Sequence, residues 1–137
     1  NTFHEENLLG AKDLKSYFYE IDSKTQEALE VIDKDLVSNA AYSLVTWLVE
    51  KRALSIYHAY EKLLVQSSVV FSLSGILKEE DLHLKQIGEN AEQFLEQYGF
   101  STALIFKIEN NAFQKLWSSI EQQIQVADTK LFSEIAP

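Results

Sequence analysis

Glu80 and His83, a carboxylate and an imidazole of the kind that bind metal ions, stand three residues apart within residues 77–87, LKEEDLHLKQI. The apolar residues around them recur at helical spacing, and residues three apart on a helix share a face. Leu77 and Leu84 belong to the apolar stripe of this helix, and Glu80 fills the gap between them. We therefore expect Glu80 and His83 to face the core or its edge. A plain hydrogen-bonded or ion pair inside a helical bundle is the alternative interpretation.

Glu50 repeats this pattern on an earlier segment. Trp47, Leu54 and Tyr57 form a stripe at three- and four-residue spacing, and Glu50 occupies the remaining place in it. An unpaired carboxylate on a buried apolar face is costly, so it normally becomes protonated, pairs with a base or binds a cation. Two neighbouring helices are thus each expected to place an acid on an apolar face.

The register of the two helices decides whether these acids can meet. Glu50 lies 15 residues before Val65, and Glu80 and His83 lie 11 and 14 residues after Val69, on either side of the expected turn. Antiparallel α-helices have the same rise per residue, so the two sites come to nearly the same height. The sequence therefore predicts that Glu50, Glu80 and His83 converge.

This arrangement resembles the carboxylate-bridged ferritin-like proteins, which include ferritins, rubrerythrins and related di-iron oxidases. Those proteins place a Glu on one helix and a Glu-x-x-His on its antiparallel partner, and then repeat that set. They often carry a Tyr seven residues after the first Glu. Here Glu50 and Tyr57 have that interval, and Glu80 with His83 supplies the second element. The resemblance covers residues 47–94 and implies a ferritin-like bundle.

The resemblance also implies a role for each of these residues. Glu80 would bridge or chelate the metal, His83 would supply a nitrogen ligand, and Glu50 would be the terminal carboxylate. Tyr57 would orient a carboxylate ligand from behind it. Carboxylates with one imidazole suit iron or manganese, and zinc is also compatible. The implied chemistry is oxidation with dioxygen or peroxide, or iron handling. The sequence identifies no small-molecule substrate and no catalytic residue, so enzymatic activity is left open.

One chain offers only half of the ligand set of that superfamily. Three His occur in the whole chain, and none lies in the last long helix, residues 101–126, where Ala112 stands at the place that would pair a His with Glu109. Three outcomes are open: a homodimer completes the site, a single metal is held with outside ligands, or the metal site has been lost. In the last case, the chain would be a metal-free binding or structural module with an unknown partner.

The composition favours one soluble helical domain over residues 1–137. The chain is 46% hydrophobic and has four Gly, one Pro and no Cys, so helix breakers are few and thiolate sites are excluded. Its net charge is −9 without a basic cluster, which argues against binding to nucleic acid. No apolar run approaches the roughly 20 residues that span a bilayer. We expect a cytoplasmic protein that does not bind membranes. The first residue is Asn, so a missing N-terminal segment remains open.

The helical periodicity predicts an all-α protein, an up-and-down antiparallel four-helix bundle of ferritin-like type with extra short helical segments. Polar residues mark the expected ends: Asp22 or Ser23 caps a second segment, Ser68 caps the helix that carries Glu80, and Gly99 terminates that helix. Trp47 and Trp117 are expected in the core. The helices are expected at residues 7–20, from about 23 to 36, 39–65, 68–98 and 101–126.

Overall fold

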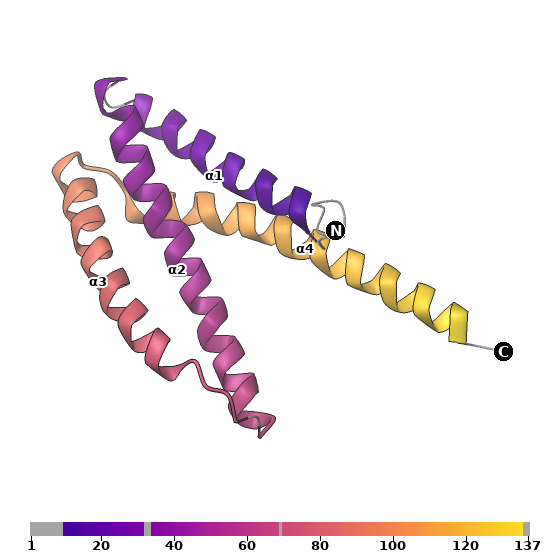
Figure 1. The fold of residues 1–137 in the computed structure, drawn as a ribbon. Helices are drawn as coiled ribbons and strands as arrows, with labels where there is room; N and C mark the ends of the chain where they lie inside the picture. The colour runs from indigo at the N-terminus through magenta and orange to yellow at the C-terminus, as the bar shows by residue number, and fades with distance from the viewer. Residues whose placement is uncertain (1–9, 32–33, 69, 136–137) are drawn as a thin grey trace, which may run out of the picture.

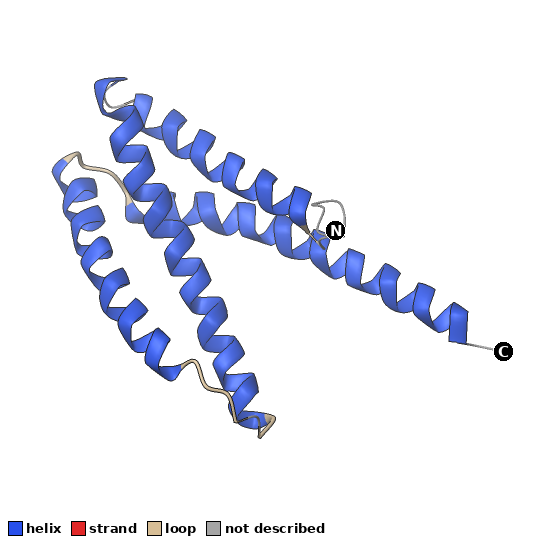
Figure 2. Cartoon of the chain, in the orientation of Figure 1, coloured by secondary structure: helices blue, strands red, loops and turns tan. Residues whose placement is uncertain are grey.

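The computed structural model describes residues 10–31, 34–68 and 70–135, which form four α-helices and no strand. Figure 2 shows the helices of the described chain joined by loops and turns. The expected all-α, up-and-down four-helix bundle is confirmed. The helices are α1 (Ala11–Glu30), α2 (Val37–Gln66), α3 (Ser74–Gln97) and α4 (Thr102–Ile135), and a short 3₁₀ helix, η2 (Lys34–Leu36), precedes α2.

Successive helices run antiparallel, and the last helix returns to the first. α1 packs on α2 and on α4, and α2 packs on α3 (Figure 1). The pairing of α1 with α4 is also antiparallel, because Gly10 contacts Gln123 whereas Glu20 contacts Lys115. The C-terminal part of α4 and the end of the α2–α3 hairpin extend beyond the region where the helices meet (Figure 1). The C-terminal part of α4 and the end of the α2–α3 hairpin therefore pack against fewer helices than the middle of the bundle does.

The hydrophobic core lies where α1 and the first parts of α2 and α4 meet the second part of α3. Trp47 is buried there as expected, whereas Trp117 is half-exposed and the expectation for it is wrong. Burial of large apolar side chains of this kind is the main stabilising contribution to such a domain. The buried core residues are Tyr17, Ile21, Leu29, Ala41, Leu44, Trp47, Leu48, Ala91, Leu95, Ile105, Ala112 and Leu116.

α1 is one continuous helix, so the expected break at Asp22 or Ser23 is wrong. Asp22 accepts a hydrogen bond from Gln26 one turn later, and Ser23 donates to the carbonyl oxygen of Glu20. Both polar side chains are thereby satisfied within the helix and do not cap a new one. The apolar face continues through this region to Leu29, and its packing holds the helix together. The expected start at residue 7 lies outside the described residues.

α3 begins at Ser74 and not at Ser68, so the predicted cap at Ser68 is wrong. Ser68 has φ of 56°, a left-handed conformation that belongs to the turn after α2. The carboxylate of Glu61, on α2, accepts hydrogen bonds of 2.6 Å from the Ser72 hydroxyl and the Leu73 amide. A side chain from the preceding helix thus accepts the backbone hydrogen bond just before α3, where a local cap was expected.

Gly99 ends α3 as predicted. It has φ of 66°, and the Phe100 amide donates to the Leu95 carbonyl oxygen at 2.7 Å while the Gly99 amide donates to that of Glu96 at 3.1 Å. This pair of hydrogen bonds is the Schellman motif, in which glycine avoids the strain that a Cβ would cause. α4 then continues to Ile135, past the expected end near Val126.

Candidate functional site

The structure brings Glu50, Glu80 and His83 together, as the register predicts. Nδ1 of His83 lies 3.7 Å from Oε2 of Glu50 and 3.8 Å from Oε2 of Glu80. Glu50 comes from α2, and the other two residues come from α3, one helical turn apart. Both distances exceed that of a hydrogen bond, so the three groups lie near one another without a direct polar bond between them. We refer to these residues as the acid–histidine cluster.

The expectation that this cluster faces the core is wrong. The side chains of Glu50, Glu80 and His83 are 36%, 50% and 55% exposed. The α2–α3 hairpin extends here beyond the part of the bundle that α1 and α4 cover, so its inner stripe meets solvent (Figure 1). Water can solvate the carboxylates, and the argument from a buried unpaired acid does not apply to them.

A metal site is not formed by one chain as it stands. Within residues 10–31, 34–68 and 70–135, no group of three or more His, Cys, Asp or Glu side chains has an arrangement that could hold a metal ion. The ligand roles inferred for Glu50, Glu80 and His83 therefore stay predictions. Tyr57, predicted to orient a carboxylate, is half-exposed and donates no hydrogen bond to a described residue.

Beside the acid–histidine cluster, α2 and α3 form an open groove of about 730 Å³. Apolar and tyrosine side chains line most of it, and Ile56, Tyr57, Tyr60 and Ile76 leave about half of their surface exposed. Contiguous exposed apolar surface of this kind is typical of an interaction site. The lining residues are Glu50, Ala53, Leu54, Ile56, Tyr57, Tyr60, Leu73, Ile76, Leu77, Glu80 and Leu84.

His58 forms a second polar contact between the same helices. Its Nε2 lies 3.0 Å from Oδ1 of Asp81, and both side chains are about half-exposed. Glu61, one helical turn after His58, binds Ser72 and Leu73 and not this imidazole. An exposed pair contributes little to stability, so this contact fixes no ligand geometry by itself.

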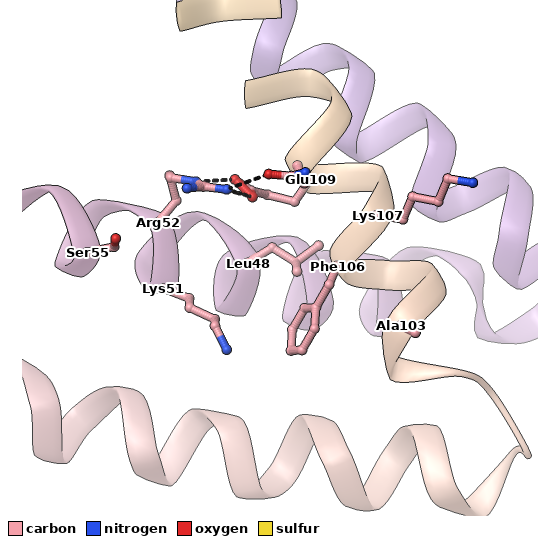
Figure 3. Close-up of a pocket in the computed structure, with 9 residues that line it drawn as sticks. Leu48, Lys51, Arg52, Ser55, Ala103, Phe106, Lys107 and Glu109 are labelled. Atoms are coloured by element: carbon pink, nitrogen blue, oxygen red, sulfur yellow. Dashed lines mark hydrogen bonds and ion pairs between the residues drawn. The ribbon is translucent and has the colours of Figure 1, made fainter. Parts of the chain in front are cut away.

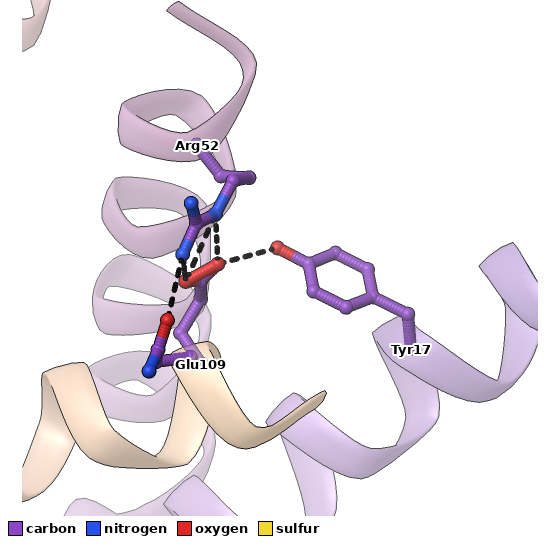
Figure 4. A network of polar contacts seen from close by, with 4 residues as sticks. Tyr17, Arg52 and Glu109 are labelled. Carbon is purple, nitrogen blue, oxygen red and sulfur yellow. Dashed lines mark hydrogen bonds and ion pairs between the residues drawn. The ribbon is translucent and has the colours of Figure 1, made fainter. Parts of the chain in front are cut away.

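The most buried carboxylate of the described residues is Glu109 of α4, and the sequence reading gave it no partner (Figure 4). Its side chain receives three hydrogen bonds from Arg52 of α2: Nε donates to Oε1 at 2.5 Å and to Oε2 at 3.3 Å, and Nη2 donates to Oε2 at 2.9 Å. The Tyr17 hydroxyl of α1 donates to Oε1 at 3.3 Å, and Arg52 Nη2 also reaches Oδ1 of Asn110 at 3.4 Å. Three helices therefore meet at one carboxylate.

The charges of this network explain the ionisation of its members. Burial raises the pKa of the Tyr17 hydroxyl, and the negative charge of Glu109 raises it further. The hydrogen bond to Glu109 raises the pKa of Arg52, whose guanidinium also lies 4.0 Å from the centre of the Phe113 ring. Arg52 thus remains charged, and Tyr17 remains a neutral donor.

The position of Glu109 could have been recognised from the sequence. It lies within the stripe formed by Ile105, Ala112 and Leu116, just as Glu80 lies within the stripe of its own helix. Its basic partner lies on another helix, 57 residues away in the sequence. Arg52 gives no comparable sign, because a single arginine on a helix is expected to be exposed to solvent.

Comparisons of the chain with models of protein families, with curated proteins and with solved structures return no match. Among the helices of the described residues, none has both the length and the apolar character needed to cross a membrane. The ferritin-like resemblance therefore rests on the spacing of Glu50, Tyr57, Glu80 and His83 alone.

Proposed function

We propose that the protein is a ferritin-like metal-binding protein that uses Glu50, Glu80 and His83 as ligands for iron or manganese. The observation that carries the proposal is the position of His83 Nδ1, within 4 Å of carboxylates from two different helices. Carboxylates combined with imidazole suit these ions. The ligands lie on rigid helices, so a small rotation of side chains would direct all three toward one ion.

A second copy of the chain would complete the site. A di-metal centre of the ferritin type uses about four carboxylates and two imidazoles, and a two-fold axis near Glu80 would supply that number from two chains. The adjoining apolar groove supports this arrangement, because a dimer formed there would cover Ile56, Tyr60 and Ile76. The homodimer and the metal centre are thus one proposal about one face of the hairpin.

The resemblance supplies the chemistry of the proposal, which is oxidation with dioxygen or peroxide, or the handling of iron. In that setting Tyr57 would orient a carboxylate ligand, and the described residues would bind and position the metal. We name no catalytic residue and no substrate.

Metal content and oligomeric state test the proposal together. We expect protein prepared with Fe(II) or Mn(II) to hold about one metal per chain, two in each dimer, by elemental analysis. Sedimentation should show a dimer that depends on the metal. Glu80→Ala and His83→Ala should abolish both properties, whereas Glu79→Ala, a neighbouring exposed acid outside the cluster, should leave them unchanged. Less than about a tenth of an equivalent of metal, unaffected by Glu80→Ala, would refute metal binding.

The open groove favours a second candidate, a metal-free module that binds another protein segment. Glu50 and Glu80 border a surface that is otherwise apolar, which fits an amphipathic helix with one basic side chain. Thermal stability with and without a chelator distinguishes the two candidates, since a bound metal stabilises the fold and its removal lowers the melting temperature. An unchanged melting temperature, with Glu80→Gln neutral or stabilising, favours the metal-free module.

A further inference from the structure

A separate pocket of about 470 Å³ lies between the faces of α2 and α4, next to the Arg52–Glu109 pair (Figure 3). Its lining follows helical spacing on both sides, so one face of each helix supplies it. It shares no residue with the groove beside the acid–histidine cluster. The lining residues are Leu48, Lys51, Arg52 and Ser55 of α2 and Ala103, Phe106, Lys107, Glu109 and Asn110 of α4.

The charge of this pocket is opposite to that of the protein. The chain has 21 acidic and 12 basic residues, yet three basic side chains and one acid line the pocket. Arg52 and Glu109 neutralise each other in the ion pair that their hydrogen bonds join. Lys51 and Lys107 form no ion pair with a described residue, and they leave the pocket with an uncompensated positive charge.

Lys51 lies over an aromatic surface and not beside an acid. Its Nζ is 4.3 Å from the centre of the Phe106 ring and 6.0 Å from that of Trp47, and these two rings pack against each other at 5.2 Å. Figure 3 shows the Lys51 and Phe106 side chains next to each other, below Leu48 in this view. An ammonium group held over aromatic rings retains free donors, and it can still pair with an anion.

Polar side chains in the lining of the pocket add hydrogen-bond donors to it. Ser55 and Asn110 bring a hydroxyl and an amide to it, and both groups can donate hydrogen bonds. Ala103 places the pocket at the first turn of α4, which begins at Thr102. The positive end of the helix dipole there adds to the attraction for negative charge. The floor, by contrast, consists of Leu48, Ala103 and Phe106 and is apolar.

We propose that this pocket binds a small amphiphilic anion, a carboxylate or phosphate group attached to an aromatic or short alkyl body. The anionic group would pair with Lys51, with Lys107 adding long-range attraction, and the apolar body would lie on Phe106 and Leu48. The Arg52–Glu109 pair would form a neutral wall and hold α2 and α4 at the separation that the ligand needs. This inference does not depend on metal binding by the acid–histidine cluster.

Trp47 provides a direct readout for this proposal. It is 3% exposed and contacts the ring that forms the floor of the pocket, whereas Trp117 is 50% exposed. In the Trp117→Phe variant, Trp47 is the sole tryptophan, because the chain has two. Phenyl phosphate, benzoate and phenyltrimethylammonium are titrated in turn with a chelator present. The titrations with phenyl phosphate and benzoate compare the two anionic headgroups. Phenyltrimethylammonium has the same aromatic ring with a headgroup of the opposite charge.

We expect both anions, or one of them, to change the Trp47 emission in a saturable manner, and the ammonium ion to have no effect. Lys51→Gln should weaken binding by about tenfold or more, because a charged hydrogen-bonding partner is lost, and Lys107→Gln should weaken it less. Lys62→Gln is the matched control: it removes an exposed lysine from the same helix outside the pocket. Calorimetric titration of the same variants checks the result without fluorescence.

Three results would overturn the proposal. The first is equal binding of the ammonium ion and the anions, which would show a purely apolar surface. The second is equal affinity for the anions in Lys51→Gln and Lys62→Gln variants that both keep the helical circular dichroism of the wild type. The absence of any saturable binding would overturn it as well. None of these results bears on metal content, since the chelator removes metal from every titration.

Discussion

Glu109 and Glu80 both lie within apolar stripes at helical spacing, and yet their surroundings differ completely. Glu109 is 5% exposed and receives three hydrogen bonds from Arg52 and one from Tyr17. The Glu80 side chain is 50% exposed, and a histidine 3.8 Å away is its described partner. Periodicity identifies the face on which a residue lies, but other helices decide whether that face is covered.

The two acids therefore have different roles in the fold. Glu109 is desolvated and must remain paired, so it ties α1, α2 and α4 together. Glu80, with Glu50 and His83, remains free to rearrange around a ligand, because water already solvates these groups. Buried polar networks rigidify a core, whereas ligand-binding groups are commonly found where the local structure is less tightly packed. The difference makes the acid–histidine cluster the better candidate for binding and Glu109 the better candidate for stability.

The sharpest test of this comparison is to remove one partner at each site. Arg52→Ala leaves Glu109 buried without its cation, and we expect a loss of about 3 kcal/mol in the free energy of unfolding. Glu80→Ala in metal-free protein removes an exposed contact and should change that free energy by less than about 0.5 kcal/mol. Urea unfolding followed by circular dichroism measures both values.

An apolar replacement of the network separates loss of pairing from loss of packing. The triple variant Arg52→Met, Glu109→Leu, Tyr17→Phe removes the buried polar groups of the network together, and it should recover most of the stability lost in Arg52→Ala. If Arg52→Ala proved as mild as Glu80→Ala, the assignment of Glu109 to the structural role would be wrong.

Thr25 offers a smaller test at the covered end of the molecule. Its side chain is fully buried, and Oγ1 has no hydrogen-bond partner among the described residues. Thr25→Val replaces the hydroxyl by a methyl group of similar size, so we expect a gain of about 1 kcal/mol and a melting temperature about 3 °C higher. Thr25→Ser, which keeps the hydroxyl and removes the methyl group, should be destabilising. A loss of stability in Thr25→Val would indicate that the hydroxyl has a partner.

Much of the fold followed from local chemistry. Apolar spacing predicted the helices that carry Glu50 and Glu80, and the residue counts on either side of Val65 and Val69 predicted that Glu50 and Glu80 come together. Gly99 predicted the end of α3 because the left-handed conformation there favours glycine. These features depend on a few neighbouring residues or on a constant rise per residue, both of which a sequence contains.

The parts that could not be predicted depend on contacts between distant segments. The start of α3 is set by Glu61, 12 residues before Leu73, and the partner of Glu109 is 57 residues away. The exposure of the acid–histidine cluster depends on where α1 and α4 end relative to the α2–α3 hairpin. The spacing within one helix contains none of this information.

Glu61 gives the last and smallest test, at the open end of the hairpin. The hydrogen bonds from Ser72 and from the Leu73 amide lower the pKa of its carboxyl group. A folded-state pKa below the unfolded value contributes stability above the unfolded pKa, and that contribution is lost as the pH falls through the folded-state pKa.

We therefore expect Glu61→Gln to lower the melting temperature slightly at pH 7 and to have less effect at pH 3, where the wild-type carboxyl group is becoming protonated. Glu79→Gln is the control, because Glu79 is an exposed acid that forms no hydrogen bond or ion pair with a described residue. Thermal melts of the three proteins at both pH values give the comparison. A Glu61→Gln effect of equal size at the two pH values would show that the charge of Glu61 does not hold the start of α3, and that the loop before this helix is fixed by its own backbone.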